Sequence, residues 1–273
     1  MDEGYVDYVA GMPMSGIIND LTGTPTLTRD ALTMANERGG EENVATGWHA
    51  IEFLLWGQDT NAMGPGARPH TDFLTTGGTA ANQERRRQHL RLVTEQLLAD
   101  LTSVRDAWLP SSTTNYAASF GADPNVALRR MLVGMGSLSG AELAGERMTV
   151  AYEERDQEDE HSCFSDNTHN DLIANAVGIQ NVYLGRYGAM DGPGIDDLVQ
   201  ARDPALNARM TQQLQASIDA LRAIPAPFDQ AILGDDSAPG RVAIARAIAA
   251  LRAQRNTIVE VATALGIQLN LEE

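Results

Sequence analysis

The sequence contains no lysine, and all 20 of its basic side chains are arginines. Acidic side chains number 37, which gives a formal net charge of -17 at pH 7. A surface with this excess of negative charge repels nucleic acid and anionic lipid and attracts cations. We therefore expect no nucleic-acid partner.

Cysteine and long apolar runs are also scarce. Cys163 is the single cysteine, so an internal disulfide bond is excluded. No apolar run reaches the roughly 18 residues that a transmembrane helix needs, and we expect no membrane span. The first residues, Met1 to Tyr5, have neither the basic start nor the apolar core of a signal peptide. They resemble the middle of a domain, which suggests that N-terminal sequence is missing.

The pattern of apolar residues predicts an all-α fold. Hydrophobic residues make up 43% of the chain and aromatic residues only 5%, a balance that favours helices over sheets. Apolar positions recur every three or four residues, and no segment shows the period of two that is typical of a strand. Loops and short helical turns are expected over residues 1–42. Longer helices are predicted over residues 42–56, 83–108, 123–155, 168–187, 203–223 and 241–265.

Local signals mark the ends of several of these helices. Asp123 and Asp203 are each followed by proline, which is the favoured order for an N-cap and the first helical turn. Thr168 with Asp171 is typical of a capping box. Gly266 follows the last predicted helix and is a common C-terminal stop.

These helices predict two helical-bundle halves. The four long helices after Asp123 are sufficient for a C-terminal four-helix bundle over residues 120–273. Residues 1–110 contain only two substantial helices, so they are expected to form a partial N-terminal bundle. This asymmetry again suggests that the first half is incomplete at its N-terminus.

The segment from Gly47 to Gly57 carries the most informative polar residues. It places His49 and Glu52 in a run that is otherwise apolar, and their three-residue spacing puts both on one face of a helix. Because aromatic and aliphatic side chains cover the other directions, we expect this helix to be buried on every side. An unpartnered buried carboxylate is unfavourable by several kcal/mol, so Glu52 requires a cation, hydrogen-bond donors or a metal ion.

Two further histidine–carboxylate pairs share this spacing. They are Glu158 with His161 and Asp166 with His169. Helical bundles bind iron, manganese or zinc with imidazole and carboxylate groups that project inward from facing helices. Each pair also has a purely structural interpretation. His49 with Glu52 is then a satisfied polar pair in the core. Glu158 with His161 is a solvated acidic turn, and Asp166 with His169 belongs to a helix cap.

The remaining titratable residues have simpler interpretations. Glu142 and Glu146 are predicted to pair with arginines from other helices, and His70 and His89 are predicted to be surface histidines.

Familiar catalytic motifs are missing. A phosphate-binding P-loop would need a lysine. The zinc-peptidase motif H-E-x-x-H and the nucleophile motif G-x-S-x-G do not occur, and the inverted motif H-x-x-E-H fails because Phe53 follows Glu52. Peptidase chemistry therefore has no local motif to support it.

Taken together, several segments resemble the imelysin family, also called peptidase family M75. Gly47-Trp48-His49-Ala50-Ile51-Glu52 fits the family's G-x-H-x-x-E motif. The other matching segments span most of the chain in the family's order: residues 53–59, 64–69, 145–148, 161–169 and 178–183. The two longest segments are quite specific.

The resemblance implies two helical-bundle halves related by an internal duplication, with the G-x-H-x-x-E motif near their interface. It implies a bacterial envelope protein, often iron-regulated and linked to iron uptake, with a historic metallopeptidase label. The motif positions are His49 and Glu52, and Asp166 and His169 lie in the second long matching segment. Family members begin with a secretion signal and further helices, which this chain does not show.

We therefore expect a metal-binding protein of the periplasm or cell envelope that captures or delivers iron. Its ligands would be His49, Glu52, Asp166 and His169, and its metal a divalent or ferric ion, with iron favoured over zinc. Envelope iron-uptake components are the expected partners. Two alternatives stay open: an M75-type metallopeptidase with a divalent metal at the same residues, and a metal-free interaction module.

Overall fold

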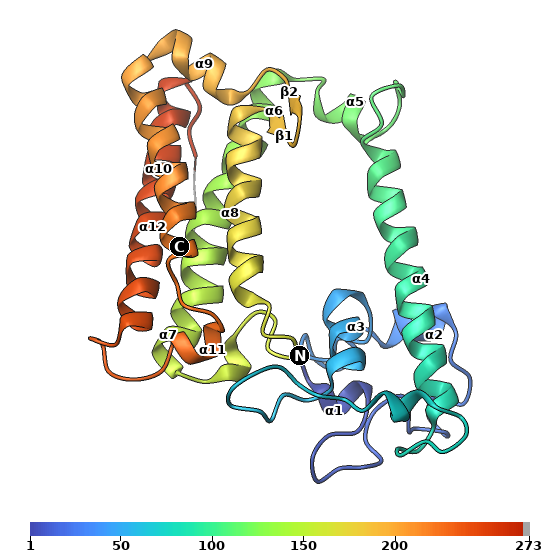
Figure 1. The fold of residues 1–273 in the computed structure, drawn as a ribbon. Helices are drawn as coiled ribbons and strands as arrows, with labels where there is room; N and C mark the ends of the chain where they lie inside the picture. The colour runs from blue at the N-terminus through green and yellow to red at the C-terminus, as the bar shows by residue number, and fades with distance from the viewer. Residues whose placement is uncertain (270–273) are drawn as a thin grey trace. The chain divides into compact units, whose positions relative to one another are not determined.

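The computed structural model describes residues 1–269 and is mainly helical, as the apolar periodicity predicts. The chain divides into two compact units, Met1–Asn115 and Tyr116–Glu273 (Figure 1). Among residues 1–269, none of the helices combines the length and apolar character that crossing a bilayer requires.

The first unit contains few helices and long irregular connections. α3 packs against α4, the longest helix of this unit, and α2 also contacts α4 (Figure 1). The helical elements are α1 (Glu3–Val6), α2 (Arg29–Ala35), α3 (Gly47–Trp56), the 3-10 turn η1 (His70–Phe73) and α4 (Gln83–Ala107).

The second unit is built on long helices around one apolar core. α12 packs against α10, α6 and η2, and α10 also packs against α8 (Figure 1). α6 continues without a break into the π-helical stretch η2 and then α7. The elements are α5 (Tyr116–Phe120), α6 (Pro124–Ser137), η2 (Leu138–Thr149), α7 (Val150–Glu154), η3 (Gln157–Asp159), α8 (Thr168–Leu184), β1 (Arg186–Tyr187), β2 (Met190–Asp191), α9 (Ile195–Arg202), α10 (Pro204–Arg222), α11 (Phe228–Ala231) and α12 (Pro239–Ala264).

The predicted N-caps of α6 and α10 are confirmed. The Asp123 carboxylate accepts hydrogen bonds from the backbone N–H groups of Asn125 and Val126, and Asp203 accepts one from Leu206. These bonds satisfy N–H groups that have no partner inside the helix.

Other boundaries differ from the prediction. α3 begins at Gly47 and not near residue 42, because the chain is extended at Thr46 (φ -135°, ψ 175°). The short helix α9 and the β1–β2 hairpin were not predicted from the sequence. Within the described residues these are the only strands, and each has two residues, which is too short for a period of two to be recognised.

Candidate metal site and the polar core beside it

His49 and Glu52 meet in the structure. Gly47 opens α3 with a φ of +85°, a conformation that glycine adopts without steric penalty. One turn later, His49 Nδ1 lies 2.9 Å from Glu52 Oε2. The imidazole is 35% exposed and the carboxylate 11% exposed, so Glu52 forms the inner part of the pair and His49 the outer part.

The helix that carries the pair is not buried on every side, and that prediction is wrong. Ala50, Phe53 and Leu54 are buried, but Trp48 is 65% exposed and Leu55 45% exposed. A ten-residue helix that packs mainly on α4 has only one face to bury, even when its other face is apolar.

Asp166 and His169 lie in the second unit, at the start of α8. Asp166 is buried and has a φ of +53°, in the left-handed region that asparagine and aspartate tolerate better than most residues. His169 is the second residue of α8 and is half-buried. Its Nδ1 atom is buried and has no hydrogen-bond partner within residues 1–269.

The predicted capping box at this helix is wrong. Asn167, and not Thr168, occupies the N-cap position. The Thr168 hydroxyl instead accepts a 2.8 Å hydrogen bond from the backbone N–H of Ser162, and Asp171 accepts one from the Asn167 amide. Thr168 thus binds the preceding turn, and Asp171 binds the side chain of the N-cap residue.

The four predicted ligands therefore fall into two pairs, one in each unit. Within the described part of each unit, no group of three or more His, Cys, Asp or Glu side chains is arranged to hold a metal ion. An imidazole and a carboxylate at 2.9 Å fit the start of a metal site in donor chemistry, but they are too few to complete one.

Of the remaining acidic candidates, two are exposed and one pairs with an arginine. Glu158 is exposed in the turn η3. Glu142 lies 3.3 Å from Arg147, so it pairs with an arginine as predicted, although within η2 and not with another helix. Glu146 is exposed.

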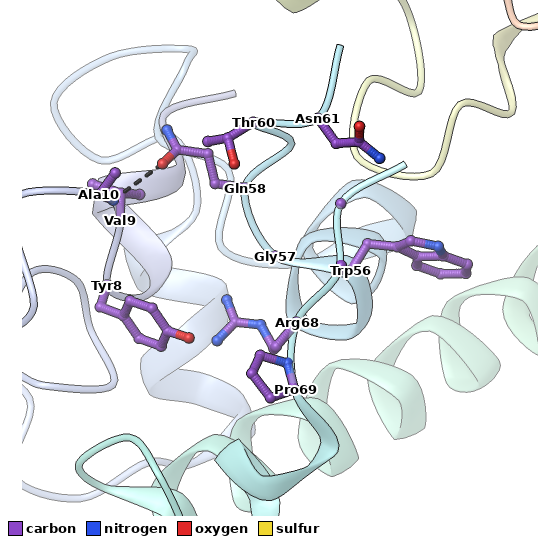
Figure 2. Close-up of a pocket in the computed structure, with 12 residues that line it drawn as sticks. Tyr8, Val9, Ala10, Trp56, Gly57, Gln58, Thr60, Asn61, Arg68 and Pro69 are labelled. Atoms are coloured by element: carbon purple, nitrogen blue, oxygen red, sulfur yellow. Dashed lines mark hydrogen bonds between the residues drawn. The ribbon is translucent and has the colours of Figure 1, made fainter. Parts of the chain in front are cut away.

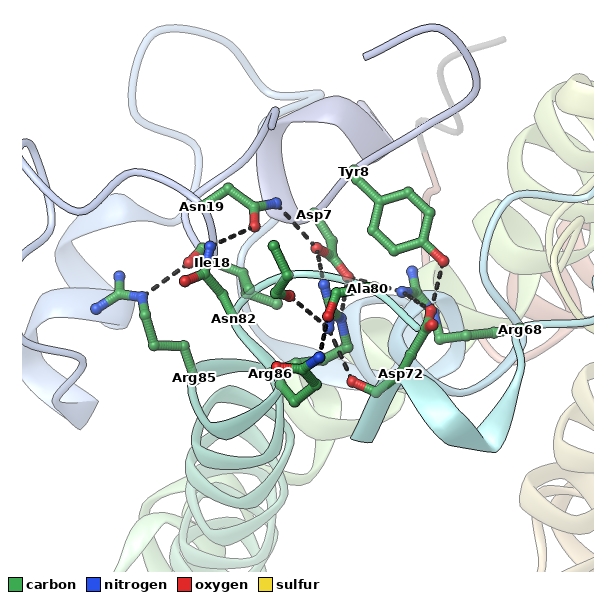
Figure 3. A network of polar contacts seen from close by, with 12 residues as sticks. Asp7, Tyr8, Ile18, Asn19, Arg68, Asp72, Ala80, Asn82, Arg85 and Arg86 are labelled. Atoms are coloured by element: carbon green, nitrogen blue, oxygen red, sulfur yellow. Dashed lines mark hydrogen bonds and ion pairs between the residues drawn. The ribbon is translucent and has the colours of Figure 1, made fainter. Parts of the chain in front are cut away.

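The most completely buried charges of the first unit form a cluster that the sequence did not predict. Asp7 accepts hydrogen bonds from Arg86 Nε at 2.6 Å and from Arg86 Nη2 at 2.9 Å, which makes a two-pronged pair (Figure 3). Arg68 Nη1 lies 2.7 Å from Asp7 Oδ2 and 3.4 Å from Asp72 Oδ2. The cluster contains two arginines and two aspartates, and their formal charges cancel.

Aromatic rings connect this cluster to α3. The Arg68 guanidinium carbon lies 4.9 Å from the centre of the Tyr8 ring and 5.2 Å from that of Phe53, which belongs to α3. The Tyr8 hydroxyl donates to Asp72 (Figure 3). Burial, followed by this hydrogen bond, raises the pKa of Tyr8 to about 12, so the phenol stays protonated.

Arginines also fix the irregular backbone of the first unit. Arg85 donates to the carbonyl oxygens of Ile17 at 3.0 Å, Ile18 at 2.8 Å and Thr24 at 2.7 Å. The neighbouring Arg86 donates to the carbonyl oxygen of Asp72 at 2.9 Å. Carbonyl groups outside helices need such donors when they are buried.

His89 is a buried histidine, and its prediction as a surface residue is wrong. It is 0% exposed, and its Nε2 lies 3.1 Å from the carbonyl oxygen of Ala45. Burial lowers the pKa of His89 to about 4, which keeps the ring neutral near pH 7. Arg86, His89 and Val93 share the buried face of α4. Their spacing is helical, but two of the three residues are polar, so the sequence did not indicate that this face is buried.

Three comparisons with known proteins agree. Residues 1–258 match the family model described as imelysin, of peptidase family M75. The chain is 29% identical over 220 residues to iron-regulated protein A of Synechococcus elongatus, an alignment that covers 80% of this chain and 57% of that protein. The chain thus spans little more than half the length of this curated relative.

A solved structure has the same fold. It comes from Parabacteroides distasonis and is named as an iron-regulated protein A precursor. The TM-score is 0.61 at 20% identity, and the match covers 94% of this chain and 78% of that one. At this identity the comparison shows the fold alone.

Proposed function

Because this chain belongs to the imelysin family, we propose that it is a cell-envelope protein that binds iron for capture or delivery. A related protein is named for its regulation by iron, and the net charge of -17 favours cations near the surface. The proposed ligands are His49, Glu52, Asp166 and His169.

The contact between His49 and Glu52 carries the proposal. In the tautomer whose Nδ1–H donates a hydrogen bond to Glu52, Nε2 of His49 carries the lone pair that a metal ion uses. A carboxylate that orients a metal-binding imidazole in this way is common around metal sites. Alternatively, a bound metal replaces the shared proton, and both residues become ligands. The first arrangement supplies a nitrogen donor, and the second supplies a nitrogen and an oxygen donor; both donor types suit iron, manganese or zinc.

His169 supports a contribution from the second unit. Its buried Nδ1 has no hydrogen-bond partner among the described residues, and an unsatisfied buried polar atom is unfavourable by about 1–3 kcal/mol. Coordination to a metal ion would satisfy this atom. Asp166, three residues earlier, has the strained left-handed backbone that is found at functional sites.

Metal binding by single variants tests the ligand set. We expect wild-type protein dialysed against ferrous iron without oxygen, and separately against zinc, to retain metal as measured by elemental analysis. His49→Ala, Glu52→Gln and His169→Ala should each weaken retention by about tenfold or more. His70→Ala is the matched control, because His70 is an exposed histidine outside the proposed set.

The pattern of losses separates the possible outcomes. Retention that is equal in wild type and all three variants would show that the proposed ligands are wrong. Loss in His49→Ala but not in His169→Ala would confine the site to the first unit. Absence of metal in wild-type protein would leave the metal-free interaction module.

The alternative is the metallopeptidase reading, since the family carries a peptidase name. It predicts peptide cleavage by zinc-loaded protein that a chelator abolishes and that His49→Ala removes. Cleavage that passes both controls would favour the enzyme over the carrier.

A further inference from the structure

The described part of each unit has a cavity with arginine in its wall. The cavity of the first unit, about 290 Å³ in volume, lies at the C-terminal end of α3, and Arg68 is the one charged residue among its described lining residues (Figure 2). The Arg68 side chain is 1% exposed and pairs with Asp7 and Asp72. Its charge is therefore compensated inside the protein and is not presented to a ligand.

The cavity of the second unit is larger and has a different wall. Its volume is about 610 Å³, and it lies between η2 and α12. None of its described lining residues is acidic, and none has a large apolar side chain, so a ligand would bury little apolar surface there. These residues are Gly140, Ala141 and Gly145 from η2 and Arg252, Arg255 and Asn256 from α12.

The wall formed by α12 presents hydrogen-bond donors. Arg252, Arg255 and Asn256 are three and four residues apart, which puts them on one face of the helix. Arg252 and Asn256 are exposed and Arg255 is half-buried, so a ligand in the cavity can reach all three side chains. A guanidinium group donates hydrogen bonds and accepts none, and it suits carboxylate and phosphate oxygens.

The two arginines are neighbouring like charges in an acidic chain. Acidic side chains outnumber basic ones by 37 to 20 in the whole sequence, yet neither arginine has a carboxylate three or four residues away on α12. Arg252 Nη2 donates a 3.4 Å hydrogen bond to the uncharged hydroxyl group of Thr149. Like charges at this helical spacing are destabilising, and an anion bound to both guanidinium groups would offset their repulsion.

Glycines keep the wall formed by η2 open. A Cβ atom on Gly140 would lie 2.3 Å from Cδ of Arg255, so a larger residue there would displace the arginine side chain. A Cβ atom on Gly145 would meet only the Gly140 carbonyl oxygen within 4 Å, at 3.4 Å. The space beside Gly145 is therefore free for a ligand. π-Helical turns such as η2 are frequent at functional sites.

We propose that this cavity binds a small oxyanion with at least two negative charges, carried by phosphate or carboxylate groups. Arg252 and Arg255 would donate to the anion, and the Asn256 amide would add a neutral donor. Hydrogen bonds in which one partner is ionised are about twice as strong as neutral ones. None of the proposed metal ligands lines the cavity, and the site needs no metal.

The test uses pyrophosphate, citrate and acetate as probes. The protein is first freed of metal on a chelating resin, because a soluble chelator is itself a polyanion. Each probe is then titrated into the full chain by calorimetry at one fixed ionic strength. We expect saturable binding of pyrophosphate or citrate that is at least about tenfold tighter than binding of acetate, since acetate can pair with only one arginine.

The probes separate the possible outcomes. Tighter binding of pyrophosphate would identify the ligand as a phosphate compound, and tighter binding of citrate would identify it as a polycarboxylate. Equal binding of acetate, or saturable binding of neither polyanion, would overturn the proposal. Because the protein is free of metal, these outcomes do not depend on the metal proposal.

Matched variants show whether binding occurs in this cavity. Gly145→Leu fills the cavity without changing the charge and should weaken polyanion binding by about tenfold or more. Gly134→Leu is its control, because Gly134 lies in α6, does not line the cavity and has open space beside it. Circular dichroism checks that each variant keeps its helices.

A second pair of variants tests the charge. Arg252→Gln should weaken polyanion binding by about tenfold. Arg246→Gln removes an exposed arginine of the same helix that does not line the cavity, and it should leave binding nearly unchanged. Binding that survives Gly145→Leu or Arg252→Gln, or that Arg246→Gln weakens equally, would overturn the site.

Discussion

The two units are stabilised by different kinds of core. In the first unit, fully buried charged side chains such as Arg86 and Asp7 lie among irregular segments. In the second, one apolar cluster fills the space between α6, η2, α8, α10 and α12. Helices satisfy most of their own backbone groups, so apolar side chains are sufficient between them. Buried loops need side-chain donors, and Arg85 and Arg86 supply them.

The difference predicts how each core responds to substitution. A buried ion pair adds little net stability when it is complete, but removing one partner leaves an uncompensated buried charge. An apolar core loses stability in proportion to the atoms removed and the cavity left behind. Substitutions that keep the shape of a side chain should therefore lower the free energy of unfolding strongly in the ionic core and only slightly in the apolar core.

The largest effect is expected for Asp7→Asn. The substitution keeps the size of the side chain but leaves Arg68 and Arg86 with one carboxylate fewer, and it should lower the free energy of unfolding by about 3–5 kcal/mol. Tryptophan emission during urea unfolding is the appropriate measurement, because all three tryptophans belong to the first unit: Trp48, Trp56 and Trp108.

The control for Asp7→Asn is Glu95→Gln in the same unit. Glu95 is 44% exposed and lies 3.6 Å from Arg91, so its loss should change stability by less than about 1 kcal/mol. If Asp7→Asn were as mild as Glu95→Gln, the charge of Asp7 would not be what compensates the buried arginines.

The next effect concerns the apolar core. Leu214 on α10 is 1% exposed, and Leu214→Ala should lower the free energy of unfolding by about 2–5 kcal/mol, measured by far-ultraviolet circular dichroism. Leu214→Met keeps most of the volume and should lower it by less than about 1.5 kcal/mol. A methionine variant as unstable as the alanine variant would show that shape, and not buried apolar volume, controls this position.

Much of the second unit was predictable because its signals are local. The aspartate–proline pairs at α6 and α10 are short motifs whose capping bonds the structure shows. Helical continuity to Glu154 also followed from the sequence, but the widening of η2 to π-helical geometry did not. A π-helix forms where packing demands it, and residue type alone does not specify it.

The polar contacts of the first unit also divide into a local one that the sequence predicts and long-range ones that it does not. The contact of His49 with Glu52 is a consequence of their spacing on one helix turn. Asp7 and Arg86 are 79 residues apart, and no local pattern pairs them. The sequence also does not show which loop carbonyl groups will need arginine donors in the folded protein. For that reason the polar core of the first unit, including His89, was missed.

His89 provides a pH-dependent test of that polar core. Its pKa is about 4 in the folded protein and 6.5 for an ordinary histidine. The unfolded chain therefore binds more protons between these values, and stability falls as the pH drops from 6.5 to 4, by up to about 1.4 kcal/mol per pH unit. Tryptophan-monitored unfolding of His89→Gln should show a shallower slope over this range.

The measurement on His89 has an independent check. The imidazole signals of His89 in the folded wild-type protein should not titrate near pH 6.5. An ordinary titration curve, or equal slopes in wild type and His89→Gln, would contradict a neutral buried ring.

The smallest expected effect is at the start of α10. The Asp203 carboxylate accepts a 3.0 Å hydrogen bond from the backbone N–H of Leu206. Asp203→Ala removes this cap and should lower stability by about 1 kcal/mol, whereas Asp203→Asn keeps an acceptor and should change it by less than about 0.5 kcal/mol. Circular dichroism during urea unfolding measures both. The same aspartate-to-asparagine change is then nearly neutral at a helix cap and severe at Asp7, because only the buried cluster depends on the charge. A loss at Asp203→Asn that equals the alanine loss would show that charge matters at both positions and would remove this contrast between the units.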